Sequence, residues 1–180
     1  MRVCVFCASS TRIDPSHVAL AAELGAELGR RGHDLVSGGG SVSSMGAVAA
    51  AVREAGGHTI GVIPQALVDL EVADDDADEL LVTETMRERK ALMDAKADAF
   101  VVLPGGIGTL EELFEVWTAL SLGMHAKPVV VLDPDGFYAP LWAYLDALRS
   151  RGFVRGTALS VLRRVTTVDD AFAALTVLAP

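Results

Sequence analysis

Short apolar runs alternate with longer amphipathic stretches along the whole sequence. The apolar runs have the length and β-branched content of buried strands, and they fall at residues 3–7, 35–36, 59–63, 80–82, 99–103, 129–132 and, as an edge strand, 162–165. Helix signals lie between them: Asp14-Pro15 begins a helix expected to end near Arg31, and Thr85 with Glu88 has the spacing of a capping box. Further helices are expected at residues 45–55, 110–122, 138–150 and from Thr167.

This alternation continues through the chain without a linker, an internal repeat or a low-complexity tract. A chain of 180 residues, of which 51% are apolar, has the size and core content of one ordinary domain. We therefore predict the α/β class. Residues 1–180 are expected to form a single-domain, Rossmann-like, doubly wound parallel sheet with helices on both faces.

Charge and hydropathy exclude several classes of partner. The formal net charge is −9, from 15 Lys and Arg against 24 Asp and Glu, which argues against nucleic-acid binding. Many of the carboxylates fall between Asp69 and Glu79, which is predicted to be a solvated loop. No charge-free apolar run is long enough to span a membrane, and Met1 to Cys7 does not have the pattern of a signal peptide. We expect a cytoplasmic protein.

The cysteines and histidines give no sign of a metal or redox site. Cys4 and Cys7 have C-x-x-C spacing but lie in a predicted strand, where residues three apart point to opposite faces, so they are expected to be buried packing residues. The four histidines are scattered, without Cys, Asp or Glu at ligand spacing. We expect neither a metal site nor a cofactor.

Two predicted strands end in glycine clusters that lead directly into helices, Gly38-Gly39-Gly40 and Pro104 to Thr109. In a doubly wound sheet, ligands bind at the carboxyl ends of strands, where helix N-termini offer N–H groups to an anion. Neither cluster is a complete dinucleotide fingerprint or P-loop, which argues against oxidoreduction and NTP hydrolysis. A nucleoside or sugar monophosphate fits these donors and the Thr109 hydroxyl. The alternative is a pair of tight turns in which glycine serves only close packing.

Charged pairs lie beside the glycine clusters in the sequence. Arg89-Lys90 follows the fourth predicted strand, Glu111-Glu112 follows the fifth, and we expect adjacent strand ends to bring them together. Such a group is able to clamp a phosphoester and activate a water molecule. Two plainer interpretations stay open: Glu112 has capping-box spacing from Thr109, and Arg89 and Lys90 fit a solvated helix face.

Four segments resemble the signatures of one family. They are Pro104 to Glu112 against P-G-G-x-G-T-x-x-E, Met86 to Lys90 against M-x-x-R-K, Gly38 to Gly46 against G-G-G-x-x-G-L-M-G, and Phe6 to Ser10 against F-C-G-S-S. The chain thus resembles the LONELY GUY (LOG) family of cytokinin-activating phosphoribohydrolases, once misassigned as lysine decarboxylases, and is most similar to its actinobacterial branch. Ser43, Ser44 and Ala8 depart from these signatures, on the side where the purine and ribose are expected.

The resemblance implies hydrolysis of the N-glycosidic bond of cytokinin riboside 5′-monophosphates, which releases the free cytokinin base and ribose 5-phosphate. It implies that Arg89 and Glu112 are the catalytic pair. Substrate-binding positions are expected at Ser9, Gly39, Gly40, Glu71, Lys90, Gly105, Gly106, Gly108, Thr109 and Thr118. It also implies a homodimer with sites near the interface, and no metal.

The chemistry fits these residues. Breaking the C1′–N9 bond develops positive charge on the ribose, which Glu112 is able to stabilise while it positions the attacking water. Arg89 does not give up its proton readily and is assigned to charge stabilisation. Two alternatives stay open: a general AMP nucleosidase that uses the same residues, and a non-catalytic nucleotide-binding or carrier protein of related fold.

Overall fold

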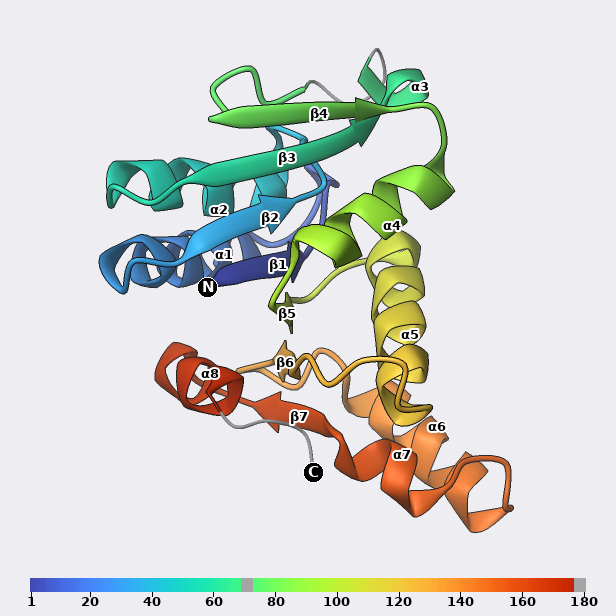
Figure 1. Cartoon of the computed structure of the whole chain (residues 1–180). Coiled ribbons are helices and arrows are strands. Elements are labelled where there is room, and N and C mark those ends of the chain that lie inside the picture. The colour runs from blue at the N-terminus through green and yellow to red at the C-terminus, as the bar shows by residue number, and fades with distance from the viewer. Residues whose placement is uncertain (69–72, 177–180) are drawn as a thin grey trace.

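The computed structural model describes residues 1–68 and 73–176, which are built around one parallel sheet (Figure 1). Its strands are β1 (Arg2–Phe6), β2 (Asp34–Ser37), β3 (Thr59–Pro64), β4 (Glu79–Thr83), β5 (Ala99–Val102), β6 (Val129–Leu132) and β7 (Leu162–Val165). They lie in the order β4-β3-β2-β1-β5-β6-β7, and every pair is parallel. The predicted fold class is confirmed.

Helices connect the strands and cover both faces of the sheet. They are α1 (Pro15–Arg30), α2 (Ser43–Glu54), α3 (Gln65–Val68), α4 (Met86–Lys96), α5 (Ile107–Ser121), α6 (Ala139–Ser150), α7 (Gly156–Ser160) and α8 (Val168–Leu175). Figure 1 shows α1, α2 and α8 on one face and α4, α5 and α6 on the other. This is the doubly wound arrangement, in which the chain winds outward from the sheet centre in two directions.

Alternating residues of the central strands feed two separate apolar cores. Val3 and Val5 of β1 pack in the core beneath α1, α2 and α8, whereas Cys4 and Phe6 pack in the core beneath α4 and α5. Cys7 belongs to the first core, so the two thiols lie on opposite faces of the sheet, and both are free and buried. The prediction that they are packing residues is confirmed.

Strands β1 and β5 are neighbours at the centre of the sheet, where the winding direction reverses. The chain leaves β1 toward β2, β3 and β4, and then crosses back through α4 to β5. The loops that follow β1 and β5 therefore lead to helices on opposite faces of the sheet, α1 and α5. This switch point is where open α/β sheets bind their ligands.

Arg89 and Glu112 do come together, as expected, but the explanation that they follow adjacent strands was wrong. Strand β4 is at the edge of the sheet, with β3, β2 and β1 between it and β5. It is α4 that closes the distance, because this helix packs across β3, β2 and β1 on its way back to β5. Arg89 is thereby carried from the sheet edge toward the switch point.

Helix α5 begins earlier than predicted, at Ile107 rather than Leu110, with Gly106 as its N-cap. Thr109 is therefore inside the first turn, and its hydroxyl donates a hydrogen bond to the Cys7 carbonyl (3.0 Å) instead of capping the helix. The interpretation of Thr109 and Glu112 as a capping box was wrong. By contrast, Thr85 and Glu88 do form the predicted capping box at the start of α4.

The acidic segment is only partly the solvated loop that was predicted. Asp75 and Asp76 are exposed, but Asp74 is buried and pairs with Arg53 at 2.9 Å, and Glu79 is already the first residue of β4. The pair, which is buried on the Asp74 side, fastens this segment to α2, and the Asp74 N–H donates to the Gly39 carbonyl at 2.9 Å. The segment is thus tied to the turn after β2.

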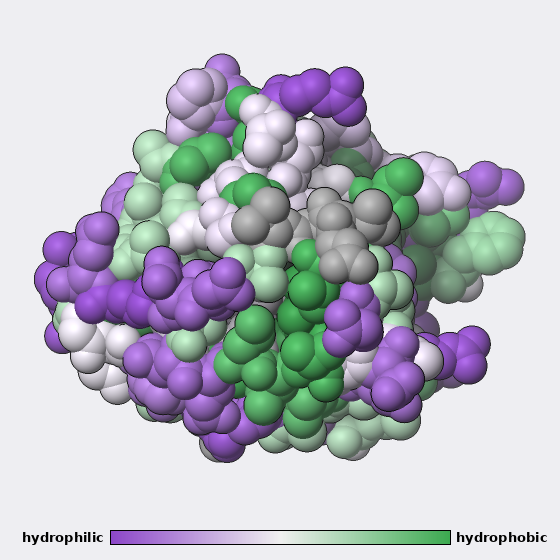
Figure 2. Space-filling view, turned by 90° about the horizontal axis from the view of Figure 1, so that it is seen from above, coloured by the Kyte–Doolittle hydropathy of each residue, from purple (hydrophilic) through white to green (hydrophobic). Residues whose placement is uncertain are grey.

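Figure 2 looks onto the side of the molecule on which β4 lies and shows apolar side chains gathered between hydrophilic ones. Within the described residues β4 pairs with β3 alone, and its Val82 is 52% exposed. Within residues 1–68 and 73–176, no helix combines the length and the apolar character needed to cross a membrane.

Candidate active site

A cavity of about 420 Å³ opens at the switch point between β1 and β5. Its walls come from the loop after β1, the glycine loop after β5, the start of α5, and α4. The predicted site residues that line it are Ser9, Arg89, Gly105, Gly106, Gly108, Thr109 and Glu112. Seven residues that are dispersed through the sequence are thus brought together in one place.

The first turn of α5 forms one wall of this cavity. Its N-cap, Gly106, makes no side-chain cap, so the first N–H groups of the helix have no capping side chain. Such an N-terminus carries partial positive charge and suits a phosphate group. A Cβ atom on Gly105 would meet the Thr109 hydroxyl at 2.1 Å, so the loop reaches this helix only because residue 105 is glycine.

Arg89 is a buried cation whose orientation is fixed by backbone carbonyls. It is 5% exposed, its Nε donates to the Val62 carbonyl at 3.0 Å, and its Nη2 donates to the Gly38 carbonyl at 3.1 Å. These acceptors come from β3 and from the turn after β2. The interpretation of Arg89 as part of a solvated helix face was therefore wrong.

The third nitrogen of the guanidinium is turned toward Glu112. Arg89 Nη1 lies 3.8 Å from Glu112 Oε1, and the two side chains are only 6% and 12% exposed. Both residues line the cavity, one from α4 and the other from α5. A partly desolvated carboxylate and a fixed cation thus stand together beside the open helix N-terminus.

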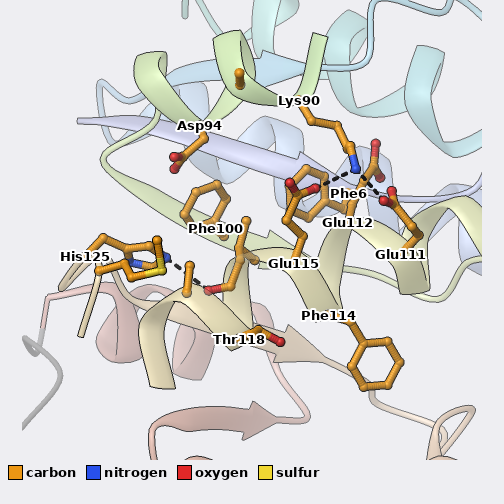
Figure 3. Close-up of a pocket in the computed structure, with 14 residues that line it drawn as sticks. Phe6, Lys90, Asp94, Phe100, Glu111, Glu112, Phe114, Glu115, Thr118 and His125 are labelled. Atoms are coloured by element: carbon orange, nitrogen blue, oxygen red, sulfur yellow. Dashed lines mark hydrogen bonds and ion pairs between the residues drawn. The ribbon is translucent and has the colours of Figure 1, made fainter. Parts of the chain in front are cut away.

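Glu112 also lines a second cavity of about 830 Å³, between α4 and α5 (Figure 3). Lys90 stands at its rim, where Nζ pairs with Glu111 and, at 2.6 Å, with Glu115. These two hydrogen-bonded carboxylates raise the pKa of Lys90. Thr118 lines the same cavity, together with the aromatic rings of Phe6, Phe100 and Phe114. Lys90 and Thr118 are therefore near Glu112 without lining the cavity at the switch point.

Two predicted positions, Gly39 and Gly40, line neither cavity, and a third cannot be placed. Gly39 has a φ of +75°, and a Cβ atom there would meet Ile63 and Val62 at 3.1–3.3 Å, so close packing on β3 explains this glycine. The Gly40 N–H faces the Met45 sulfur at 3.1 Å. Neither residue lines the cavity at the switch point. Glu71 lies outside the described residues.

Other cavity residues were not predicted from the sequence. His17 of α1 and Phe137 from the loop before α6 line the cavity and pack edge to face, with ring centroids 5.5 Å apart. Met86 and Ile107 line its mouth and are 44% and 88% exposed. His17 was treated as one of four scattered histidines, and no spacing signal marks it. Only the fold shows that it faces the glycine loop.

Within residues 1–68 and 73–176, no three His, Cys, Asp or Glu side chains are grouped so as to hold a metal ion. The charged and polar groups that line the cavity at the switch point include a carboxylate, a fixed guanidinium and helix N–H groups. These groups suit an anionic substrate on which positive charge develops during the reaction.

Fold and site together define a doubly wound α/β protein with a cavity at its switch point, beside the N-terminus of α5. Residues 45–175 match the protein family described as "Possible lysine decarboxylase", and the chain belongs to that family. This confirms the resemblance to the LONELY GUY family, whose members once carried the lysine decarboxylase name.

Curated relatives extend the match over nearly the whole chain. The chain is 53% identical over 175 residues to the cytokinin riboside 5′-monophosphate phosphoribohydrolase of Mycobacterium tuberculosis. The matched region covers 96% of this chain and 91% of the relative. It is 46% identical over 169 residues to the cytokinin riboside 5′-monophosphate phosphoribohydrolase LOG of Oryza sativa subsp. japonica. This match covers 94% of this chain and 70% of the relative.

Solved structures include proteins of a different name with the same architecture. The molybdenum cofactor carrier protein of Chlamydomonas reinhardtii superposes with a TM-score of 0.71 at 26% identity, covering 96% of this chain and 94% of that one. The molybdenum cofactor binding protein of Rippkaea orientalis gives a TM-score of 0.72 at 21% identity, covering 96% and 93%. The second likeness concerns the fold alone.

Proposed function

We propose that this protein is a cytokinin riboside 5′-monophosphate phosphoribohydrolase: it uses water to cleave the N-glycosidic bond of N6-modified AMP into free base and ribose 5-phosphate. The observation that carries this proposal is the Arg89–Glu112 pair, 3.8 Å apart and nearly buried, in the same cavity as the open N-terminus of α5. The names of the curated relatives point to the same activity.

The glycine loop and the start of α5 bind the 5′-phosphate in this proposal. Gly105, Gly106 and Gly108 leave room for the phosphate oxygens to approach the backbone, and a Cβ atom on either of the last two would meet nothing within 4 Å. The Thr109 hydroxyl donates its proton to the Cys7 carbonyl and so holds the start of α5 against the loop after β1. Backbone N–H groups and the helix dipole therefore carry most of the phosphate recognition.

Glu112 acts on the ribose and on water. As the bond from C1′ to N9 breaks, the electron pair leaves with the base and positive charge develops on the sugar, where a carboxylate stabilises it. The same carboxylate orients the water whose oxygen bonds to C1′ and accepts a proton from it. The departing base takes up a proton from the solvent, to which Glu112 later returns the proton that it accepted. Arg89 holds Glu112 in place and stabilises charge, since its guanidinium stays protonated.

The larger cavity beside Glu112 receives the remainder of the substrate. Lys90 and Thr118 contact it there, and Phe6, Phe100 and Phe114 provide an apolar wall for an N6 substituent. Ser9 approaches from the loop after β1. Glu71 remains a predicted substrate contact, and a cytoplasmic location likewise remains a prediction from the sequence.

A homodimer is part of the same proposal. Phe114, Leu122 and Met124 are 36%, 69% and 75% exposed on α5 and in the loop after it, and Phe114 and Met124 line the larger cavity. Exposed apolar side chains that gather in one patch are typical of a protein–protein interface. A second copy placed over α5 would enclose the cavity, and light scattering of the purified protein tests for it. A monomer at micromolar concentration would contradict this part of the proposal.

The activity is tested by incubating the protein with AMP and, separately, with isopentenyladenosine 5′-monophosphate, and by measuring ribose 5-phosphate. We expect faster release from the modified nucleotide. Equal release from both would identify a general AMP nucleosidase, and no release from either would favour a nucleotide carrier. A carrier needs the anion site but has no use for Glu112 beside Arg89.

The assigned residues are tested by Glu112→Gln, which keeps the shape of the side chain and removes its charge, and by Arg89→Lys, which keeps the charge and loses the fork of donors. Both are expected to lower kcat at least about 10²-fold with little change in nucleotide binding. Glu23→Gln, an exposed carboxylate of α1, serves as the matched control. Wild-type turnover by Glu112→Gln would remove Glu112 from the mechanism.

A further inference from the structure

Tyr138 lies buried beneath the glycine loop, at a position that none of the motifs includes. Its side chain is 3% exposed, and its hydroxyl donates a hydrogen bond to the Leu103 carbonyl at 2.8 Å. The phenol thus holds the carbonyl of the residue before Pro104, where the chain leaves β5 for α5.

The position of Tyr138 is itself fixed from β6. Asp133 follows β6, is 8% exposed, and accepts hydrogen bonds from the backbone N–H groups of Phe137 (2.8 Å) and Tyr138 (3.0 Å). The Tyr138 ring packs against Phe137 and Trp142, with centroids 4.9 and 6.0 Å away. The phenol is therefore a rigid support that is anchored on the strand next to β5.

Burial raises the pKa of Tyr138, so the phenol keeps its proton and remains both a donor and an acceptor at neutral pH. Pro104 has no N–H, and the Leu103 carbonyl is the backbone group by which the phenol holds this turn. Without the hydroxyl, the buried Leu103 carbonyl would lose its partner, and the turn would be free to shift. Such a shift would move the start of α5, which begins two residues after Gly105.

We propose that Tyr138 is a positioning residue for phosphate recognition: its hydroxyl fixes the Leu103–Gly105 turn and thereby aims the first N–H groups of α5 at the 5′-phosphate. This inference rests on the proposed function, because it assigns the phosphate to the start of α5. Tyr138 touches no substrate and acts through the backbone of the loop. Its effect is expected on the phosphate and not on the glycosidic bond.

The chain contains two tyrosines, which provides a matched pair of variants. Tyr138→Phe removes the hydroxyl that bonds to Leu103, and Tyr144→Phe removes a hydroxyl from a side chain that is 62% exposed on α6, the helix that begins directly after Tyr138. The measurements are the dissociation constant of ribose 5-phosphate by calorimetry, and kcat/KM for the nucleoside monophosphate and for the corresponding riboside without phosphate.

With Tyr138→Phe, we expect the dissociation constant of ribose 5-phosphate to rise about tenfold. The preference for monophosphate over riboside is expected to fall by a similar factor, whereas kcat/KM for the riboside stays near that of the wild type. Tyr144→Phe should change neither quantity. A folded Tyr138→Phe protein with wild-type phosphate affinity and preference would overturn the proposal, as would an equal change in Tyr144→Phe.

Asp133→Asn provides a second test if Tyr138→Phe does not fold, because it keeps the hydroxyl and weakens the support beneath it. The same changes are expected, about threefold in size, and their absence would overturn the proposal. A wild-type protein that binds ribose 5-phosphate but hydrolyses no nucleotide would overturn the proposed hydrolysis only, since the binding measurements still decide the role of Tyr138. A wild-type protein that does not bind ribose 5-phosphate would overturn both.

Discussion

The Nη2 atom of Arg89 occupies the place where a side chain at Gly38 would begin: a Cβ atom there would lie 1.9 Å from this nitrogen and 3.1 Å from Cζ. Gly38 therefore provides both the carbonyl that receives the guanidinium and the space in which it lies. The glycine cluster after β2 serves the site in this way, although Gly39 and Gly40 do not line the cavity.

We predict that Gly38→Ala displaces the guanidinium from the Gly38 carbonyl and from Glu112. A displacement of about 1 Å at a reacting group is able to lower turnover about 10²-fold, so kcat should fall by that order while nucleotide binding changes little. Steady-state kinetics on the purified variant, with the folded fraction measured by circular dichroism, provide the test.

Gly25→Ala is the control for this variant. Its new Cβ atom would lie 2.4 Å from the Val48 carbonyl, at the contact between α1 and α2 and away from the cavity. It should lower the melting temperature without changing kcat per folded molecule. If Gly38→Ala keeps wild-type kcat, the close packing of Gly38 against Arg89 has no catalytic role.

The Arg53–Asp74 pair is predicted to hold the acidic segment against α2. Asp74→Ala leaves Arg53, whose side chain is 23% exposed, without the carboxylate that it meets at 2.9 and 3.3 Å. Breaking such a pair should cost about 3 kcal/mol of unfolding free energy. Urea denaturation measures the loss, and Asp75→Ala, an exposed neighbour, should change the free energy by less than about 0.5 kcal/mol. Equal losses would show that the pair contributes no more than a surface charge.

Two helix caps that act within one helical turn were interpreted correctly from the sequence. Asp14 caps α1 by accepting from the Ser16 N–H at 2.9 Å, and Thr85 forms the capping box of α4, because every partner lies within three residues. The alternation of strands and helices likewise gave the parallel sheet. The short helices α3 and α7 were missed, since four or five residues are too few to display a helical period.

Long-range contacts decided the features that the sequence left open. Thr109 and Glu112 have the same spacing as Thr85 and Glu88, yet the Thr109 hydroxyl bonds to Cys7, 102 residues away. The buried Arg89 side chain donates hydrogen bonds to the backbone carbonyls of Val62 and Gly38. Because every residue has a backbone carbonyl, the residue types in the sequence do not indicate these acceptors. The family motifs include several residues that line one cavity, because such motifs record the outcome of long-range contacts, which spacing alone does not.

Both thiols are predicted to be unreactive in the folded protein. Burial raises the pKa of Cys4, and it raises that of Cys7 to about 12, with Glu112 adding to both shifts. Since the thiolate is the reactive form, a thiol-specific reagent at pH 8 should label neither residue in the native state and both in denaturant. Labelling on the time scale of seconds without denaturant would contradict the burial of these side chains.

Asp78 is predicted to make folding stability depend on pH in the acid range. Its carboxylate accepts from the Thr59 N–H at 2.8 Å and the Thr59 hydroxyl at 2.9 Å, and these bonds lower its pKa in the folded protein below 3.8. The folded state therefore favours the charged form. The resulting stability is present above pH 3.8 and is lost as the pH falls through the lowered value.

Asp78→Asn removes this charge, so the variant should be less stable than the wild type at pH 7, and the difference should shrink as the pH falls below about 4. The free energy of unfolding in urea, measured at several pH values between 3 and 7, tests the prediction. Asp76→Asn is the control, because Asp76 is exposed in the same segment and does not accept the hydrogen bonds from Thr59. A stability difference for Asp78→Asn that is the same at pH 3 and pH 7 would mean that Thr59 recognises the shape of the side chain and not its charge.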